Sequence, residues 1–344
     1  MYRFSSDYLE GAHPRLLEKL IQTNAEQTAP YGEDVYCRAA ADLIRLRCRN
    51  RGAAVVFVPG GTMANLAVAA ACLRPHQGVL SAQTGHVNTH EAGAIEATGH
   101  RVLALPSQDG KLSAEQIRKA MLDYRGDPVR EHTVQPKLVY ISQPTELGTV
   151  YSLGELEQIS AVCREFNLFL YVDGARLAYA LRAEKNDVDL PDLAQLTDVF
   201  LIGGTKVGAL FGEALVIPSP ALQADFRSIV KQRGGLMAKG RLMGLQFLAL
   251  FEDDLYFDIA EHANRMAQAI RQACREAGYP FLVDSPTNQQ FPILPNALVA
   301  RLSQDFDFSL WQDLKDSQAV RFCTSWATPF SAVESLAAAI RAGA

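Results

Sequence analysis

The order of apolar and polar residues predicts short buried strands separated by amphipathic helices. Short apolar runs rich in β-branched and aromatic residues indicate buried strands, and apolar residues at helical spacing indicate helices. The predicted strands lie at 53–58, 79–82, 101–105, 138–142, 168–172, 199–202 and 214–217. The predicted helices between them lie near 63–73, 89–98, 113–124, 152–166 and 176–184. Strands that alternate with helices predict a doubly wound, mainly parallel sheet.

The pattern differs at the two ends of the chain. After a short arm, two amphipathic helices are predicted to begin at His13-Pro14 and at Gly32-Glu33-Asp34. From Gly234 to Gly278 the spacing is helical throughout, and the remaining residues predict short strands and a last helix at 332–341. We therefore predict an α/β fold with two domains. The large domain, with the N-terminal arm, covers 1–250, and a smaller α/β domain covers 251–344.

The composition is that of a well-packed globular protein and excludes several classes of partner. Of the 344 residues 48% are hydrophobic, and the net charge of −5 with scattered basic residues offers no patch for nucleic acid or an anionic membrane. The apolar runs are shorter than a membrane span, and the N-terminus lacks the apolar segment of a signal peptide. The 6 cysteines include no C-x-x-C pair. We expect a cytoplasmic protein with reduced cysteines, no bound metal and a small-molecule ligand.

Two polar side chains follow predicted strands at the point where each strand ends. Asp173 closes the strand at 168–172, and Lys206 follows the strand at 199–202 after a glycine turn. Ligands collect at the carboxyl ends of strands in open α/β sheets, so both side chains could face one site. The pair suits pyridoxal phosphate, because a lysine amine forms a Schiff base with its aldehyde and an aspartate keeps its ring nitrogen protonated. A helix-capping aspartate and a solvated loop lysine are the structural alternative.

A glycine turn precedes the helix predicted at 63–73. Pro59-Gly60-Gly61-Thr62 joins this helix to the strand at 53–58. Free backbone N–H groups and the helix dipole attract an anion at such a position. Neither nucleotide-binding fingerprint is met, so we expect a single phosphate, with an ordinary turn as the alternative.

Histidines and arginines beside apolar runs are further candidates. His86 and His90 would share one face of a helix, as zinc ligands do, but no third ligand lies nearby in the sequence. His86 could instead stack on a cofactor ring, and two exposed polar histidines are the remaining alternative. Arg176 and Arg321 each have a planar fork that suits a carboxylate or a phosphate. The helix dipole disfavours a cation in a first turn, which favours a functional role for Arg176.

Together these motifs resemble the threonine aldolase family, within the fold-type I, β-eliminating-lyase-like group of pyridoxal-phosphate enzymes, and look closest to bacterial low-specificity L-threonine aldolases. The resemblance covers almost the whole chain. It is carried by SSDYLEGAHP, YGEDVYCRAAADL, FVPGGTMANLAVAA, TGHVNTHEAGA, ISQPTELGTVY, VDGARLAYA, GGTKVGALFGEALV, KQRGGLMAKGRL and VRFCTSW. The order and spacing of VDGAR, GGTK-x-G and GHxxxxE are specific when taken together.

The resemblance implies a role for each candidate residue. Lys206 would be the Schiff-base lysine, Asp173 the partner of the pyridine nitrogen, and His86 the side chain stacked on the ring; these three would be catalytic. The implied cofactor-binding residues are Lys206, Asp173, His86, Gly61, Thr62 and Arg176. The implied substrate-binding residues are Ser6, Arg176, Arg321, Tyr36 and Glu146. The fold implied is that of fold-type I pyridoxal-phosphate-dependent transferases.

The chain departs from the family at one position near the substrate hydroxyl. Many members carry a second histidine in an N-T-H-N stretch, where this chain has Pro144-Thr145-Glu146. The base that takes the hydroxyl proton is therefore open between His86, His90, Glu146 and a bound water.

The resemblance also implies a reaction and an assembly. The reaction is the cleavage of L-threonine or L-allo-threonine, as β-hydroxy-α-amino acids, to glycine and an aldehyde. A pyridoxal-phosphate-dependent β-eliminating lyase or aminotransferase acting on another amino acid is the alternative. The assembly is a homodimer or homotetramer with active sites between subunits, where Tyr36 and Lys239 could reach the neighbour's cofactor.

Overall fold

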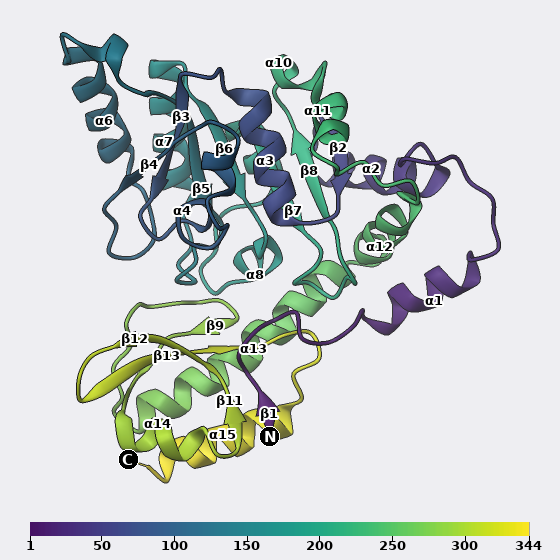
Figure 1. The fold of residues 1–344 in the computed structure, drawn as a ribbon. Helices are drawn as coiled ribbons and strands as arrows, with labels where there is room; N and C mark the ends of the chain where they lie inside the picture. The colour runs from purple at the N-terminus through teal and green to yellow at the C-terminus, as the bar shows by residue number, and fades with distance from the viewer. Residues whose placement is uncertain (344) are drawn as a thin grey trace.

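The structure, a computed structural model, describes residues 1–343. Within these residues a seven-stranded sheet has the order β2-β8-β7-β6-β5-β3-β4 (Figure 1). Its strands are β2 (Ala54–Val58), β3 (Gln77–Ala82), β4 (Val102–Leu105), β5 (Gln135–Ser142), β6 (Phe169–Asp173), β7 (Val199–Gly203) and β8 (Glu213–Ile217). Strands β3 to β7 run parallel, and β8 is antiparallel to both of its neighbours. The predicted mainly parallel sheet is confirmed.

Helices cover both faces of this sheet because successive strand residues point to opposite sides. In β6, Leu170 and Val172 belong to one core, whereas Tyr171 belongs to the other. The first core is covered by α1 (Pro14–Gln22), α2 (Val35–Arg47), α6 (Ala114–Gly126), α7 (Leu153–Phe166), α8 (Leu177–Leu181), α9 (Leu190–Leu196) and α12 (Arg241–Glu252). The second is covered by α3 (Gly61–Cys72), α4 (His86–Thr89), α5 (Ala94–Ala97), α10 (Pro220–Gln223) and α11 (Phe226–Gln232). The sheet is therefore doubly wound, as predicted.

The long helix α13 (Leu255–Glu276) leads from this sheet to a smaller lobe (Figure 1). The lobe contains β9 (Gln289–Gln290), β10 (Ile293–Pro295), α14 (Asn296–Leu302), β11 (Phe306–Asp307), β12 (Ser309–Asp313), β13 (Ser317–Cys323) and α15 (Phe330–Arg341). The N-terminal strand β1 (Tyr2–Arg3) pairs with β11, so the arm starts in the small lobe. The predicted boundary after residue 250 falls near the end of α12 and stays a prediction.

Two helix predictions were wrong in detail. The helix expected at 89–98 is split into α4 and α5, because Ala92 and Gly93 adopt positive φ angles of 50° and 71°. The stretch from Gly234 to Gly278 is not continuous, since α12 begins at Arg241 and Asp254, with φ of 58°, separates it from α13. Each helix that the structure describes is too short or too polar to span a bilayer.

Candidate active site

One cavity of about 330 Å³ opens at the carboxyl ends of the parallel strands. It is lined by the turn after β2, the start of α4, the loop after β5, and the segments that follow β6 and β7. The predicted site residues that line it are Gly61, Thr62, His86, Glu146, Asp173, Arg176 and Lys206. The fold thus brings together side chains from five separate segments at the edge where ligands collect in open α/β sheets.

Lys206 is half-buried in the wall of this cavity, and hydrogen bonds hold the turn that carries it. The amide of Gly204 donates to Glu213 Oε2 at 2.7 Å, and the Tyr179 hydroxyl donates to the Lys206 carbonyl at 2.5 Å. Glycine is required at 203, because a Cβ there would collide with the Ala175 carbonyl oxygen. Burial, and then the positive charge of Arg176, lower the pKa of the Lys206 amine. A lowered pKa favours the neutral, nucleophilic amine.

Asp173, the last residue of β6, is held in one orientation by three donors. Its Oδ1 accepts from the Ala175 amide at 2.9 Å, and its Oδ2 accepts from the Tyr140 hydroxyl at 2.6 Å and from the Asn65 amide at 3.4 Å. The side chain is buried with only 5% of the residue exposed. A fixed carboxylate at this depth can bind a protonated ring nitrogen without having to reorient.

His86 is fixed from two sides. Its Nδ1 lies 2.8 Å from Glu91 Oε1, and the same oxygen accepts from Asn65 Nδ2 at 2.6 Å. Its backbone N–H donates to Glu146 Oε1 at 2.9 Å. The rings of His86 and His90 lie stacked with centroids 5.7 Å apart, rather than converging on one point. Among residues 1–343 no group of three or more His, Cys, Asp or Glu is placed to hold a metal ion.

Glu146 lies beside His86 in the cavity wall. Its Oε1 also accepts from the Ser142 hydroxyl at 2.7 Å. Burial raises the pKa of Glu146, although the Ser142 hydroxyl and the His86 amide oppose that effect. Both residues therefore line the cavity next to each other.

Three other predicted residues lie outside the lining of this cavity. Arg321, on β13, donates through Nη2 to the Ser5 carbonyl at 2.8 Å, whereas its Nε and the Ser6 hydroxyl are buried without a hydrogen-bond partner within residues 1–343. Such unpaired polar atoms are the kind that a ligand satisfies. Tyr36, on α2, donates its hydroxyl to Glu26 and lies on the exposed side of its helix.

Several residues that hold the site together were missed from the sequence. The sequence carries a signal for two of them, since Asn65 is a polar residue within an alanine-rich helix and Glu213 is a charged residue at the start of an apolar strand. Burial raises the pKa of Glu213 to about 7. Tyr140 carried no such signal, because an aromatic residue in a buried strand is ordinary.

The residues present fit pyridoxal phosphate. The Lys206 amine and the Asp173 carboxylate line the same cavity, and so do Gly60, Gly61 and Thr62 at the start of α3. The first turn of α3 has no side-chain cap, so its N–H groups are available to a phosphate. When bound, this cofactor supplies an electron-withdrawing ring that stabilises a carbanion at the substrate α-carbon.

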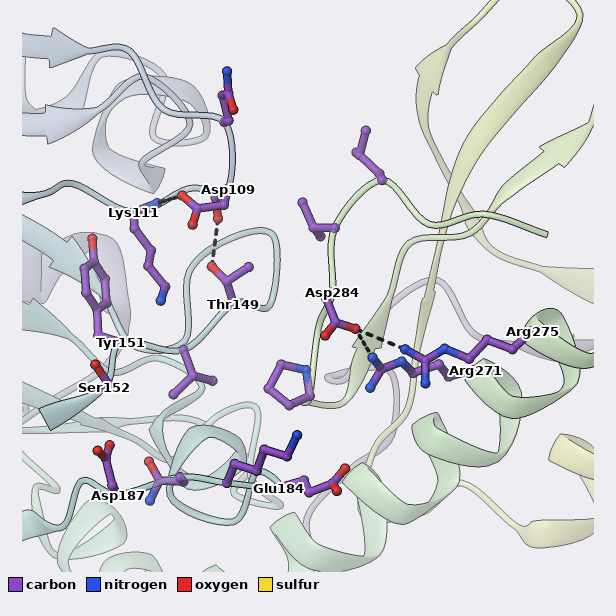
Figure 2. Close-up of a pocket in the computed structure, with 17 residues that line it drawn as sticks. Asp109, Lys111, Thr149, Tyr151, Ser152, Glu184, Asp187, Arg271, Arg275 and Asp284 are labelled. Carbon is purple, nitrogen blue, oxygen red and sulfur yellow. Dashed lines mark hydrogen bonds and ion pairs between the residues drawn. The ribbon is translucent and has the colours of Figure 1, made fainter. Parts of the chain in front are cut away.

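A larger cavity of about 760 Å³ lies between the large and small lobes (Figure 2). Three of its basic side chains are already paired, since Arg271 and Arg275 both contact Asp284 (Figure 2), and Lys111 donates to Glu155. It contains none of the predicted cofactor or substrate residues among the described residues that line it. The smaller cavity is therefore the candidate active site.

Comparisons with known proteins identify the family of the chain. The sequence model of the β-eliminating lyase family matches residues 4–296. The low-specificity L-threonine aldolase of Pseudomonas aeruginosa is 33% identical, over 98% of this chain and 97% of the relative. A threonine aldolase structure from Leishmania major superposes with a TM-score of 0.97 at 45% identity, over 99% of both chains. An aspartate aminotransferase from Thermus thermophilus, at 14% identity and a TM-score of 0.74, shares the fold. The chain therefore belongs to the β-eliminating lyase family, within its threonine aldolase group.

Proposed function

We propose that this protein cleaves L-threonine and L-allo-threonine to glycine and acetaldehyde, with pyridoxal phosphate bound at Lys206. The observation that carries the proposal is the Lys206 amine in one cavity with the fixed Asp173 carboxylate and the open N-terminus of α3. Relatives that match nearly the full chain are named as threonine aldolases, which favours this reaction over the other chemistries of the fold.

In the proposed reaction, each of these residues of the cavity has its own task. Asp173 would keep the proton on the ring nitrogen. Arg176 would bind the substrate carboxylate through its guanidinium and thereby set which bond at the α-carbon faces the ring. If Nδ1 of His86 donates its proton to Glu91, Nε2 remains free to accept the proton of the substrate hydroxyl. Loss of that proton releases the aldehyde, and return of a proton to the α-carbon yields glycine.

The proposal includes an assembly and a location. We propose a homodimer or homotetramer in which Tyr36 and Lys239 approach the cofactor of a neighbouring subunit. In support, Lys239 lines a different cavity of its own chain, together with Glu26 and Arg241. The cysteines are free and buried, which supports action in a reducing compartment such as the cytoplasm.

The test combines a spectrum with a product assay. The purified protein should show the visible absorbance of a lysine-bound pyridoxal phosphate, and added L-threonine should yield acetaldehyde that alcohol dehydrogenase reduces at the expense of NADH. Visible absorbance without acetaldehyde, but with ammonia and a keto acid from another amino acid, would contradict the reaction and keep the cofactor. A protein that takes up no pyridoxal phosphate would contradict both.

A further inference from the structure

The charge of Arg176 is already paired within the chain. Its Nε donates to Asp7 Oδ2 at 2.7 Å, and its Nη2 donates to Asp7 Oδ1 at 3.0 Å. The Asp7 side chain is fully buried, and that of Arg176 is 14% exposed. Burial alone would raise the pKa of Asp7, but Arg176, Lys206 and Asn288 together outweigh burial and lower that pKa. The pair is therefore ionised at neutral pH.

The geometry of this pair leaves part of the guanidinium available. Arginine has five N–H donors in one plane, and a side-on pair with a carboxylate occupies Nε and one hydrogen of Nη2. Asp7 thus leaves the outer edge of the guanidinium, formed by Nη1 and the second hydrogen of Nη2, available to another acceptor. Arg176 lines the active-site cavity, where this edge can bind a second carboxylate with two parallel hydrogen bonds.

Asp7 also joins three parts of the molecule. It lies in the N-terminal arm, Arg176 follows β6 of the large lobe, and Asn288 of the small lobe donates to Asp7 Oδ2 at 2.9 Å. Asn288 is fully buried. It follows the loop that carries Asp284 along the cleft of Figure 2, and Ser285 in that loop donates to the Gly148 carbonyl of the large lobe at 3.1 Å.

We propose that Asp7 is a positioning residue for substrate recognition. It orients the outer edge of Arg176 toward the carboxylate of an α-amino acid, and Asn288 holds Asp7 in place from the small lobe. The inference rests on the proposed function only in taking an α-amino acid as the ligand. Its consequence is that the arm and the small lobe determine how strongly the site selects a free carboxylate.

A purely structural role for Asp7 predicts a different effect on ligand binding from the positioning role proposed above. Removal of one partner of a buried ion pair destabilises a protein whatever the pair does for ligands. Stability therefore cannot separate the two roles. Selection between a ligand with a carboxylate and the same ligand without one can, because that selection depends on the orientation of the groups that bind the carboxylate, Arg176 among them.

The experiment measures binding of glycine and of glycinamide to the pyridoxal-phosphate-loaded protein, through the absorbance change on addition of each ligand. We expect Asp7→Asn to raise the Kd of glycine by about tenfold or more, because one of two charge-assisted hydrogen bonds to Arg176 is lost. The Kd of glycinamide should stay within about twofold, since it lacks the carboxylate. Glu10→Gln is the matched control, because Glu10 is an arm carboxylate that contacts the small lobe through Ser325 and does not contact Arg176.

Asn288→Ala provides a second, milder variant that leaves the ion pair itself intact. It should weaken glycine binding in the same direction, and the double variant with Asp7→Asn should be no weaker than Asp7→Asn alone. Equal weakening of both ligands in Asp7→Asn, or unchanged binding of both in either variant, would overturn the inference. A wild-type protein that binds glycine but forms no acetaldehyde from threonine would contradict the proposed function and leave this inference standing.

Discussion

At the scale of single residues, Lys206 and Asp173 have separable effects. Lys206→Ala should remove both the turnover of L-threonine and the visible absorbance of the lysine-bound cofactor, because no other amine lines the cavity among the described residues. Asp173→Ala should keep the absorbance and lower turnover by at least about a hundredfold, since the ring nitrogen loses its fixed carboxylate. Spectra and acetaldehyde assays of both variants check this. A fully active Lys206→Ala would contradict the assignment.

Glu213 predicts a pH dependence of stability in the cofactor-free protein. Burial raises its pKa from 4.5 to about 7 in the folded state. A carboxyl with a raised pKa stabilises the fold fully below its unfolded pKa, and that stabilisation is lost as the pH rises through the folded value. The free energy of unfolding should therefore fall between pH 4.5 and about 7, by on the order of 3 kcal/mol from this group.

Denaturant unfolding at several pH values measures this dependence. In Glu213→Gln the side chain cannot ionise, so the decline over that window should become smaller by the contribution of Glu213. Glu334→Gln, at an exposed position of α15, is the control and should keep the wild-type decline. An unchanged decline in Glu213→Gln would show that the carboxyl does not titrate in this range.

At the scale of elements, periodicity located the sheet strands because each is a short apolar run that both cores bury. Periodicity failed where the backbone conformation of a single residue ends a helix. Asp254 adopts the left-handed conformation and ends the apparent helix of 234–278, although aspartate is also found within helices. Helix α14 was missed, because its seven residues are too few to show a clear helical period.

The contact between α2 and α12 depends on a glycine. A Cβ at Gly244 would lie 2.6 Å from the nitrogen and the α-carbon of Cys37, so the two helix backbones would have to separate. We expect Gly244→Ala to lower the free energy of unfolding by roughly 2–3 kcal/mol, as overpacking of a core does. Gly154→Ala in α7 is the control. A Cβ there meets nothing within 4 Å, so the better helix propensity of alanine should stabilise that variant.

Both variants are compared by thermal or denaturant unfolding against the wild type. Destabilisation by Gly154→Ala as large as that by Gly244→Ala would show that the close approach of the two helices is not the cause.

At the scale of the whole molecule, the strand ends predicted which edge of the sheet carries the candidate site, but not which contacts hold its side chains in place. Asp173 stands out because it directly follows an apolar run, and Lys206 because it follows another after a short glycine turn. The partner of Arg176 could not be predicted, since Asp7 lies 169 positions earlier in the chain, in an arm that pairs with the small lobe. Contacts of this kind depend on the packing of lobes, which local patterns do not encode.

The proposed assembly predicts where a second subunit binds. Ile21 on α1 and Met237 before α12 are 75% and 41% exposed, and their neighbours Leu20 and Ala238 line one cavity. Exposed apolar residues gathered in one region mark an interface. The double variant Ile21→Asp with Met237→Asp should therefore shift the protein toward monomers in sedimentation velocity and lower its activity in parallel. Leu122→Asp is the control, because Leu122 is 55% exposed on α6, which lies at the opposite edge of the sheet from α1 (Figure 1). A wild-type protein that sediments as a monomer, or a double variant with unchanged mass, would contradict an interface at α1.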